Sequence, residues 1–317
     1  KHNRTSMNTR ADDKPWPMQG TDSLAFQRQD SKVECGTLPT TGDITVELEI
    51  IYQDEQLVVI NKPSGLLVHR SEIDRHATDF ALQLVRNQVG QRVYPVHRLD
   101  KPTSGVLVFA MQPEIASLVV EQWRQRNIEK HYLAIVRGYM PEFTHLDYAM
   151  SPPVDKYAKH ERVKPPQEAI TDFTCLSTVE IPVEIDKYPQ SRYSLINCRP
   201  FTGRKHQLRR HLKHLSHPII GDARYGKGRH SRYFRDHMDA PRLLLHAWSL
   251  SMEHPTTGEE LTFVAPLDRV LRKLMDDFDW VDHLPTALQL GLTTPPHASM
   301  DAYLRSDEDE EASANPQ

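Results

Sequence analysis

The stretch from Val96 to Ala110 constrains the fold of this chain more than any other. It places one carboxylate, Asp100, shortly after a histidine and an arginine and ahead of a run of apolar residues. Pro102 fixes one backbone angle, and Gly105 can adopt conformations closed to other residues. The segment therefore predicts a rigid turn followed by a buried strand over 106–110. An acid held in such a turn keeps a fixed direction, which is what a catalytic carboxylate needs.

The rest of the chain predicts one mixed α/β domain between two flexible ends. Residues 1–45 are polar and lack apolar periodicity, which is typical of a disordered extension. Apolar periodicity over 46–285 predicts the folded domain that carries Asp100, and the acidic segment 286–317 predicts a disordered tail. No internal repeat is present. With 317 residues the chain has ample length for a buried core.

Periodicity also predicts the main elements. Alternating or continuous apolar runs predict strands over 44–52, 57–60, 132–136, 170–176 and 193–198. Helical spacing predicts helices over 78–89 and 113–126, the second with a buried stripe of Ile115, Leu118, Val119 and Trp123. A third, basic amphipathic helix is predicted from Leu208, Leu212 and Leu215, which share one helical face.

Composition indicates the cellular setting. No window approaches the ~18 uninterrupted apolar residues of a membrane span, and residues 1–30 contain no apolar core of a secretory signal. Cys35, Cys175 and Cys198 are too scattered for a disulfide framework or a C-x-x-C metal site. We therefore expect a cytoplasmic protein with no membrane partner.

The net charge of −4 conceals an uneven distribution. The segment 307–311 is entirely acidic, whereas the segment 199–233 holds ten Lys and Arg residues against Asp222 alone. Such a basic block is typical of a surface that binds a polyanion. An acid on that kind of surface repels phosphate, so a chemical function is one reason to retain Asp100 beside it. A structural ion pair is the common alternative for an Asp near an Arg.

The motifs around these residues resemble those of the RluA-type pseudouridine synthases, which isomerise uridine in structured RNA. The matching segments, in order, are 61–65 (NKPSG), 97–105 (HRLDKPTSG), 130–138 (KHYLAIVRG), 203–209 (GRKHQLR), 217–222 (HPIIGD) and 242–247 (RLLLHA). The resemblance runs from about 48 to 268. It implies an α+β fold with a mixed, mainly antiparallel central sheet flanked by helices and loops, and an active-site cleft across the sheet.

The resemblance also implies roles for individual residues. Asp100 would be the catalytic aspartate, Tyr132 the active-site tyrosine and Arg209 the basic partner of the aspartate. Arg98 would enter the RNA near the space that the target base leaves. The other expected RNA-binding residues are His97, His69, Arg70, Arg204, Lys205 and Arg210, of which Arg204, Lys205 and Arg210 would hold phosphates.

The physical properties of these groups agree with that assignment. A guanidinium near Asp100 favours the ionised carboxylate over the carboxylic acid. The anion could attack C1′ of the ribose or remove a proton from C2′, and the sequence leaves both routes open. Tyr132 could stack on the uracil and assist removal of the C5 proton. The target must leave its stack, so base flipping is expected.

No cofactor or metal is expected. The isomerisation needs no redox partner, and neither G-x-G-x-x-G nor a P-loop pattern occurs. The histidines at 206, 211, 214 and 217 are close in sequence, but metal ligands need a shared direction and supporting contacts. The expected partner is therefore RNA, bound by a monomer.

The RNA target is less constrained. Residues 67–75 and 205–212 look most like the branch that modifies uridine 65 of tRNA. Ribosomal RNA is the main alternative, since the core motifs are shared across targets. A non-catalytic RNA-binding factor would have little need for Asp100 and Tyr132 together. A glycosidase-like hydrolase would need paired carboxylates.

Overall fold

The computed structural model describes residues 47–69, 79–152 and 165–293. By its contacts the chain divides into a unit of residues 1–45 and a unit of residues 46–317, and all described residues belong to the second. The expected N-terminal extension, residues 294–317 of the expected acidic tail and the expected RNA-binding residue Arg70 lie outside the described residues.

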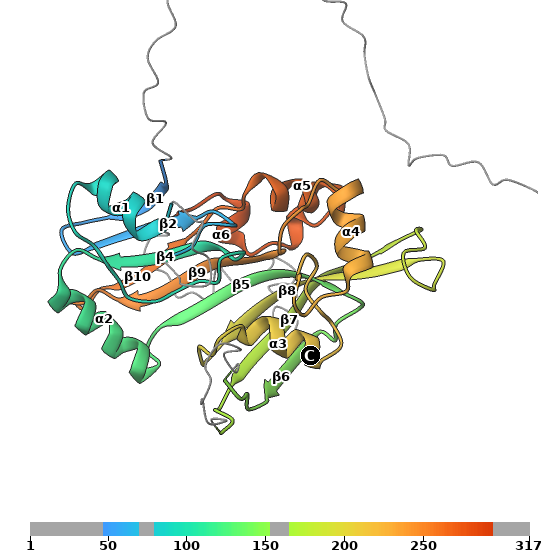
Figure 1. Cartoon of the computed structure of the whole chain (residues 1–317), viewed down its shortest axis with the longest axis horizontal. Helices are drawn as coiled ribbons and strands as arrows, with labels where there is room; N and C mark the ends of the chain where they lie inside the picture. Colours follow the sequence, from blue (N-terminus) through green and yellow to red (C-terminus); the bar gives the residue numbers. More distant parts are fainter. Residues whose placement is uncertain (1–46, 70–78, 153–164, 294–317) are drawn as a thin grey trace, which may run out of the picture. The chain divides into compact units, whose positions relative to one another are not determined.

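The described residues form a ten-stranded sheet that carries the whole fold (Figure 1). Its main path is β1(Glu49–Gln53), β2(Leu57–Lys62), β4(Ser104–Ala110), β9(Leu245–Glu253), β5(Glu129–Arg137), β8(Ser191–Pro200), β7(Ile170–Ile181) and β6(Phe143–Asp147). The remaining strands are β3(Tyr94–Pro95), which pairs with β4, and β10(Glu260–Val264), which pairs with β9. Among these strands, every pairing except that of β4 with β9 is antiparallel. The predicted α+β class and mainly antiparallel sheet are confirmed.

Helices pack on both faces of the sheet (Figure 1). They are α1(Ala81–Val89), α2(Pro113–Gln125), α3(Gln207–His214), α4(Gly228–His237), α5(Arg269–Asp277), the 3-10 turn η1(Val281–His283) and α6(Thr286–Gln289). Alternate residues of β5 separate two cores: Leu133 and Ile135 pack with α4 and α5, whereas Ala134 and Val136 pack with α3. The basic helix therefore covers one face of the central strands.

Two expectations are wrong: the burial of Leu118 and the end of the folded domain at residue 285. Leu118 is 47% exposed, because the buried face of α2 is built on Ile115 and Val119, one helical turn apart, and Leu118 lies beside it. The ordered fold also continues past residue 285. Helix α6 follows that boundary, and its Ala287 is buried in the core that contains α4 and α5.

Among the described residues, no helix has the length and apolar content needed to cross a membrane.

Gly105 shows why the opening turn requires glycine. Its φ of +112° lies in the region that side chains disfavour. A Cβ at this position would also lie 2.1 Å from the carbonyl oxygen of Ala247, at the parallel pairing of β4 with β9. The sequence expectation for Gly105 is confirmed.

We expect Gly105→Ala to destabilise the protein much more than Gly65→Ala. Both glycines have positive φ, which costs an alanine about 1–2 kcal/mol, but a Cβ at Gly65 meets nothing within 4 Å. The difference in unfolding free energy between the two variants therefore measures the cost of the clash between the added Cβ at residue 105 and β9. Urea unfolding midpoints test this, and equal losses for the two variants would show that the close approach to Ala247 does not matter.

Three histidines make the fold sensitive to acid. Burial lowers the pKa of His97 to about 3 and the pKa values of His230 and His246 to about 4, from an ordinary value of 6.5. Between pH 6.5 and about 4 the unfolded chain therefore binds more protons than the folded one, and stability falls as the pH falls through this window. The loss from pH 6.5 to pH 5 should be about 2 kcal/mol per histidine. Urea unfolding across this range checks it, and a pH-independent midpoint would contradict it.

Candidate active site

A cavity of about 210 Å³ brings together residues that are distant in the sequence. Its walls come from the turn before β4, the start of β5 and β9, and the segment leading into α3. The expected site residues that line it are Asp100, Tyr132, Arg209, Arg98, Arg204 and Lys205. The three residues expected to act in catalysis therefore share one cavity.

The Asp100 turn is fixed by the turn that follows β2. The backbone N–H of Thr103 donates to the Asp100 carbonyl oxygen at 3.0 Å. Ser64 Oγ donates to the carbonyl oxygen of Pro102 at 2.8 Å, and the Gly65 N–H donates to that of Lys101 at 2.9 Å. These contacts hold the backbone on both sides of the carboxylate, whose side chain is 20% exposed.

A fully buried lysine ties the same two turns together. Lys62 Nζ donates to the carbonyl oxygens of Pro63 and Leu66, both at 2.8 Å, and to that of Lys101 at 3.2 Å. Burial, assisted by the charge of Arg242, lowers the pKa of Lys62 to about 7. Sequence matching identified the segment that contains Lys62 but not this positioning contact.

Arg209 joins the Asp100 carboxylate to a second, buried carboxylate. Its Nη1 donates to Asp100 Oδ2 at 3.1 Å, while Nε and Nη2 donate to the two oxygens of Asp222 at 2.7 and 2.9 Å. Burial works to lower the pKa of Arg209, but these hydrogen bonds and charges raise it above its usual value. The guanidinium therefore stays charged and holds Asp100 in one orientation.

Asp222 is in turn held by the backbone. Burial works to raise its pKa, but hydrogen bonds from Arg209 and from the N–H groups of Arg224 and Tyr225 hold the pKa below its usual range. The Tyr225 ring lies 5.2 Å from the Arg209 guanidinium carbon. Sequence reasoning assigned no role to Asp222, although its being the single acid in the basic block was a usable signal.

Tyr132 is half-buried at the start of β5, where a register shift between His131 and Tyr132 interrupts the pairing with β9. Burial, reinforced by the nearby negative charge of Asp100, raises its pKa. The hydroxyl therefore stays protonated at neutral pH. In that state Tyr132 can stack on a planar ring and donate a hydrogen bond. It is not a phenolate that could accept a proton.

The loop before α3 forms another wall of the cavity, and buried Gln207 fixes it. Gln207 Oε1 accepts from Thr202 Oγ1 at 2.8 Å and from the Arg204 N–H at 3.0 Å. Its Nε2 donates to the Ile170 carbonyl oxygen and to Thr171 Oγ1 on β7, both at 3.0 Å. The loop that carries Arg204 and Lys205 is thereby attached to the sheet.

His206 is a cavity residue that the expected site did not include. Its backbone is left-handed, with φ of +58°, immediately before α3. One ring nitrogen, Nδ1, lies 3.0 Å from the Tyr225 hydroxyl, and the other, Nε2, lies 3.8 Å from Asp100 Oδ2. Burial lowers the pKa of His206, although the charge of Asp100 acts against this.

We expect His206→Asn to lower the turnover number by about fivefold, the effect of losing ~1 kcal/mol of positioning. Asparagine tolerates left-handed backbone, so the fold should persist. His206→Val should also lose stability, because a β-branched residue does not tolerate that conformation. Turnover and melting temperature of both variants test this. Unchanged turnover in His206→Asn would exclude a positioning role for the ring.

The other expected RNA-binding residues are dispersed. Arg98 and Lys205 are exposed at the cavity, and Arg204 is held there by donating from Nε to the Glu168 carbonyl oxygen. His69 is exposed and Arg210 partly exposed, and neither lines the cavity.

His97 differs most from expectation. Its ring packs on Trp123 with the ring centroids 4.9 Å apart. Its Nε2 accepts the Val108 N–H at 3.0 Å, and burial with the charge of Lys130 lowers its pKa to about 3. The neutral ring therefore supports β4 and lies outside the cavity.

The closely spaced histidines His211, His214 and His217 each contact different residues. His211 lies within hydrogen-bond distance of Thr171 Oγ1 and the Tyr148 carbonyl oxygen, and His214 stacks on the Tyr148 ring. His217 Nδ1 donates to the Arg137 carbonyl oxygen. Within the described ranges, no three His, Cys, Asp or Glu residues are grouped to hold a metal ion.

Comparison with known proteins agrees with this geometry. Residues 56–214 match a family model described as RNA pseudouridylate synthase. A protein of Vibrio vulnificus named tRNA pseudouridine synthase C is 50% identical over 242 residues, covering 76% of this chain and 99% of that protein. The protein of the same name from Pasteurella multocida is 49% identical over 235 residues, covering 74% and 97%.

Solved structures give the same fold. Human RNA Pseudouridylate Synthase Domain Containing 4 aligns with a TM-score of 0.55 at 30% identity, covering 73% of this chain and 93% of that one. Human RNA Pseudouridylate Synthase Domain Containing 1 aligns with a TM-score of 0.56 at 22% identity, covering 88% and 99%. The sequence and the overall fold thus agree across these comparisons.

Proposed function

This chain belongs to the RNA pseudouridylate synthase family, and on that premise we propose that it converts uridine 65 of tRNA into pseudouridine. The enzyme class, an RNA pseudouridine synthase, follows from the family. The tRNA substrate is supported by the names of the bacterial relatives, which match most of this chain. The observation that carries the mechanism is the Asp100 carboxylate, held by Arg209 in a cavity whose rim is basic.

The cavity suits one nucleotide taken out of a strand. Its volume of about 210 Å³ is below the roughly 300–1,000 Å³ typical of pockets for drug-sized ligands. The target uridine therefore flips out of its stack to reach Asp100. Exposed Arg98 lies beside Asp100 and fills the space the base leaves, and Tyr132 stacks on the uracil ring.

Asp100 starts the reaction as a carboxylate. In one route it bonds to C1′ as the C1′–N1 bond breaks, and the electron pair leaves with the uracil. In the other it removes the C2′ proton, and the same C1′–N1 bond breaks to leave an unsaturated sugar. The uracil anion then turns and its C5 bonds to C1′, which releases the carboxylate or returns the C2′ proton.

The last step moves a proton. C5 loses its hydrogen to a base, and N1 gains a proton, so that product and substrate have the same composition. Because the pKa of Tyr132 is raised, its hydroxyl must give up its own proton as it takes another. Tyr132 therefore acts by relaying a proton to Asp100 or to water.

Basic residues in the cavity lining and on the nearby surface hold the RNA backbone. Arg204 and Lys205 stand on the loop before α3, Arg210 follows on the helix, and His69 is exposed after β2. Arg70, which continues that segment, belongs to the same proposal. These contacts position the RNA without reading its sequence.

Chemical mapping of pseudouridine after reaction with the purified protein tests the substrate. Unmodified tRNA should acquire one pseudouridine, at position 65, and a tRNA with cytidine at that position should acquire none. Ribosomal RNA fragments serve as the competing substrate. Modification of ribosomal RNA with no modification of tRNA would replace the proposed target.

A further inference from the structure

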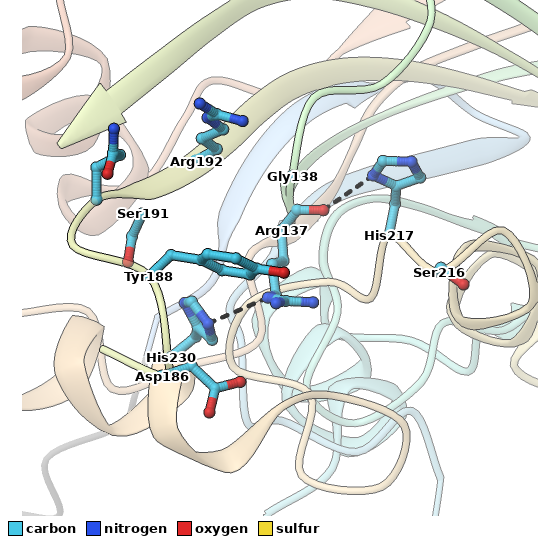
Figure 2. A pocket seen from close by; sticks show the side chains of 10 residues that line it. Arg137, Gly138, Asp186, Tyr188, Ser191, Arg192, Ser216, His217 and His230 are labelled. Atoms are coloured by element: carbon cyan, nitrogen blue, oxygen red, sulfur yellow. Dashed lines mark hydrogen bonds between the residues drawn. The ribbon is translucent and has the colours of Figure 1, made fainter. Parts of the chain in front are cut away.

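A second cavity lies at the end of β5 (Figure 2). Its volume of about 440 Å³ exceeds that of the cavity around Asp100. Its walls come from the end of β5, the connection between β7 and β8, the segment after α3, and α4. We propose that this cavity binds a nucleotide of the tRNA at a distance from the target uridine. The inference rests on the proposed function and adds a second contact to it.

A prearranged guanidinium lies in this cavity. Arg137 Nε donates to Nε2 of buried His230 at 3.1 Å (Figure 2). Nδ1 of His230 lies 2.8 Å from the Tyr193 hydroxyl. Burial lowers the pKa of His230 to about 4, so the neutral ring accepts the Arg137 hydrogen bond at neutral pH. In the part of the chain that the structure describes, Nη1 and Nη2 of Arg137 have no acceptor. These donors are available to a phosphate group.

An aromatic ring borders the same cavity. Tyr188 is 56% exposed, and the contact described for its ring is with Lys187, whose Nζ lies 5.0 Å from the ring centroid. An exposed tyrosine beside cationic groups is the arrangement on which nucleic-acid bases stack. Phosphate donors and a stacking face together fit one nucleotide better than a phosphate alone.

The charge of the cavity also favours a polyanion. Arg192 lines it and is exposed, with an ion pair to Glu180 at the surface. The carboxylate in the lining, Asp186, is paired with Arg229 at 3.0 Å. Such exposed pairs are weak and can exchange partners with a phosphate. An acidic ligand is therefore preferred over a basic one.

Two elements connect this cavity to the catalytic one. Arg137 follows Tyr132 by five residues in β5, which corresponds to about 16 Å of strand. His217, which also lines the second cavity, follows Arg209 by eight residues along and just beyond α3, roughly 12 Å at helical rise. Since a duplex advances about 3.4 Å per base pair, an RNA strand of a few nucleotides spans the distance between the two cavities.

The cavity lies where an RNA strand can pass from one face of the β-sheet to the other. Along β5, Arg137 alternates with Tyr132 and points to the face covered by α4. His217 comes from the side covered by α3, and Gly138, with a φ of +85°, lines the cavity beside it. A Cβ at Gly138 would lie 3.2 Å from the His217 ring. RNA bound at Asp100 therefore reaches this cavity around the end of β5.

The test compares KM and the turnover number for tRNA between cavity variants and matched controls. Tyr188→Ala is paired with Leu118→Ala, a comparably exposed residue on α2. Arg192→Ala is paired with Arg235→Ala, since both arginines are exposed and each is paired with one carboxylate. Melting temperatures verify that all four variants fold.

We expect KM to rise about fivefold or more in Tyr188→Ala, the effect of losing one stacked base, with the turnover number unchanged. Arg192→Ala should reduce the slope of log affinity against log salt by about 1. Both controls should match the unaltered enzyme. On a short hairpin that contains the target uridine but cannot reach the second cavity, all variants should react alike.

Two results would overturn the inference while leaving the proposed function intact. The first is equal KM values for the cavity variants and their controls on full-length tRNA. The second is an equal penalty on full-length tRNA and on the hairpin, which would place the effect in the catalytic cavity. Failure of the unaltered enzyme to modify tRNA would overturn the proposed substrate and, with it, this occupant of the cavity.

Discussion

Asp100→Asn is expected to abolish pseudouridine formation, with a loss of roughly 10⁴-fold or more in turnover. The amide can neither bond to C1′ as an anion nor take the C2′ proton, so both routes fail. The side chain is 20% exposed, and its turn is held by hydrogen bonds from Ser64 Oγ and from the Gly65 N–H. The fold should therefore survive the change. Turnover is measured by pseudouridine mapping on tRNA.

RNA binding should be retained in the same variant. Removing a negative charge from a basic cavity does not weaken its attraction for phosphate, so the dissociation constant should stay within a few-fold of the original. Asp282→Asn, an exposed change in η1, is the matched control and should leave both quantities unchanged. Turnover by Asp100→Asn at a rate near that of the control would exclude Asp100 as the reacting group.

Arg209→Ala is expected to damage stability and turnover together. Its loss leaves the Asp222 carboxylate, with a side chain only 1% exposed, buried without its cation. Breaking a buried ion pair in this way costs about 3–5 kcal/mol. The same change removes the guanidinium that holds Asp100, and misplacement of a reacting group by about 1 Å can cost about 10²-fold in rate. Urea unfolding and turnover at low temperature test both effects.

Arg210→Ala is the control for this prediction. Arg210 is the next residue of α3 and carries the same charge, but it is partly exposed and has no side-chain partner among the described residues. Its substitution should change stability by no more than about 0.5 kcal/mol. Arg209→Lys, which keeps the charge but loses the two-pronged contact to Asp222, should fall between the two. Similar stabilities for the changes at 209 and 210 would contradict the buried network.

Local sequence patterns predicted the helices and strands, but not how each of them packs against its neighbours in the fold. Proline at the start of α2 and apolar spacing placed that helix correctly, whereas the exposure of Leu118 depends on the angle at which α2 packs. Composition indicated a tail after residue 285, but Ala287 is buried because the core of α4 and α5 leaves space for one more turn. Such packing depends on residues far away in the sequence.

The site shows the same division. Motifs identified Asp100, Tyr132 and Arg209, and the structure brings all three to one cavity. The roles of Asp222 and His206 were not predicted, since each depends on a partner that only the folded chain brings near: the Arg209 side chain and the Asp100 carboxylate. His97 has a motif position beside the cavity, yet its ring is turned toward Trp123.

Release of the C5 hydrogen is the most direct test of the central claim, that Asp100 drives isomerisation of one tRNA uridine. Pseudouridine formation removes this hydrogen, because C5 becomes the atom bonded to C1′. With tRNA carrying tritium at C5 of its uridines, the unaltered enzyme should release one tritium per tRNA molecule and the Asp100→Asn variant none. No release by the unaltered enzyme, or equal release by both proteins, would contradict the account.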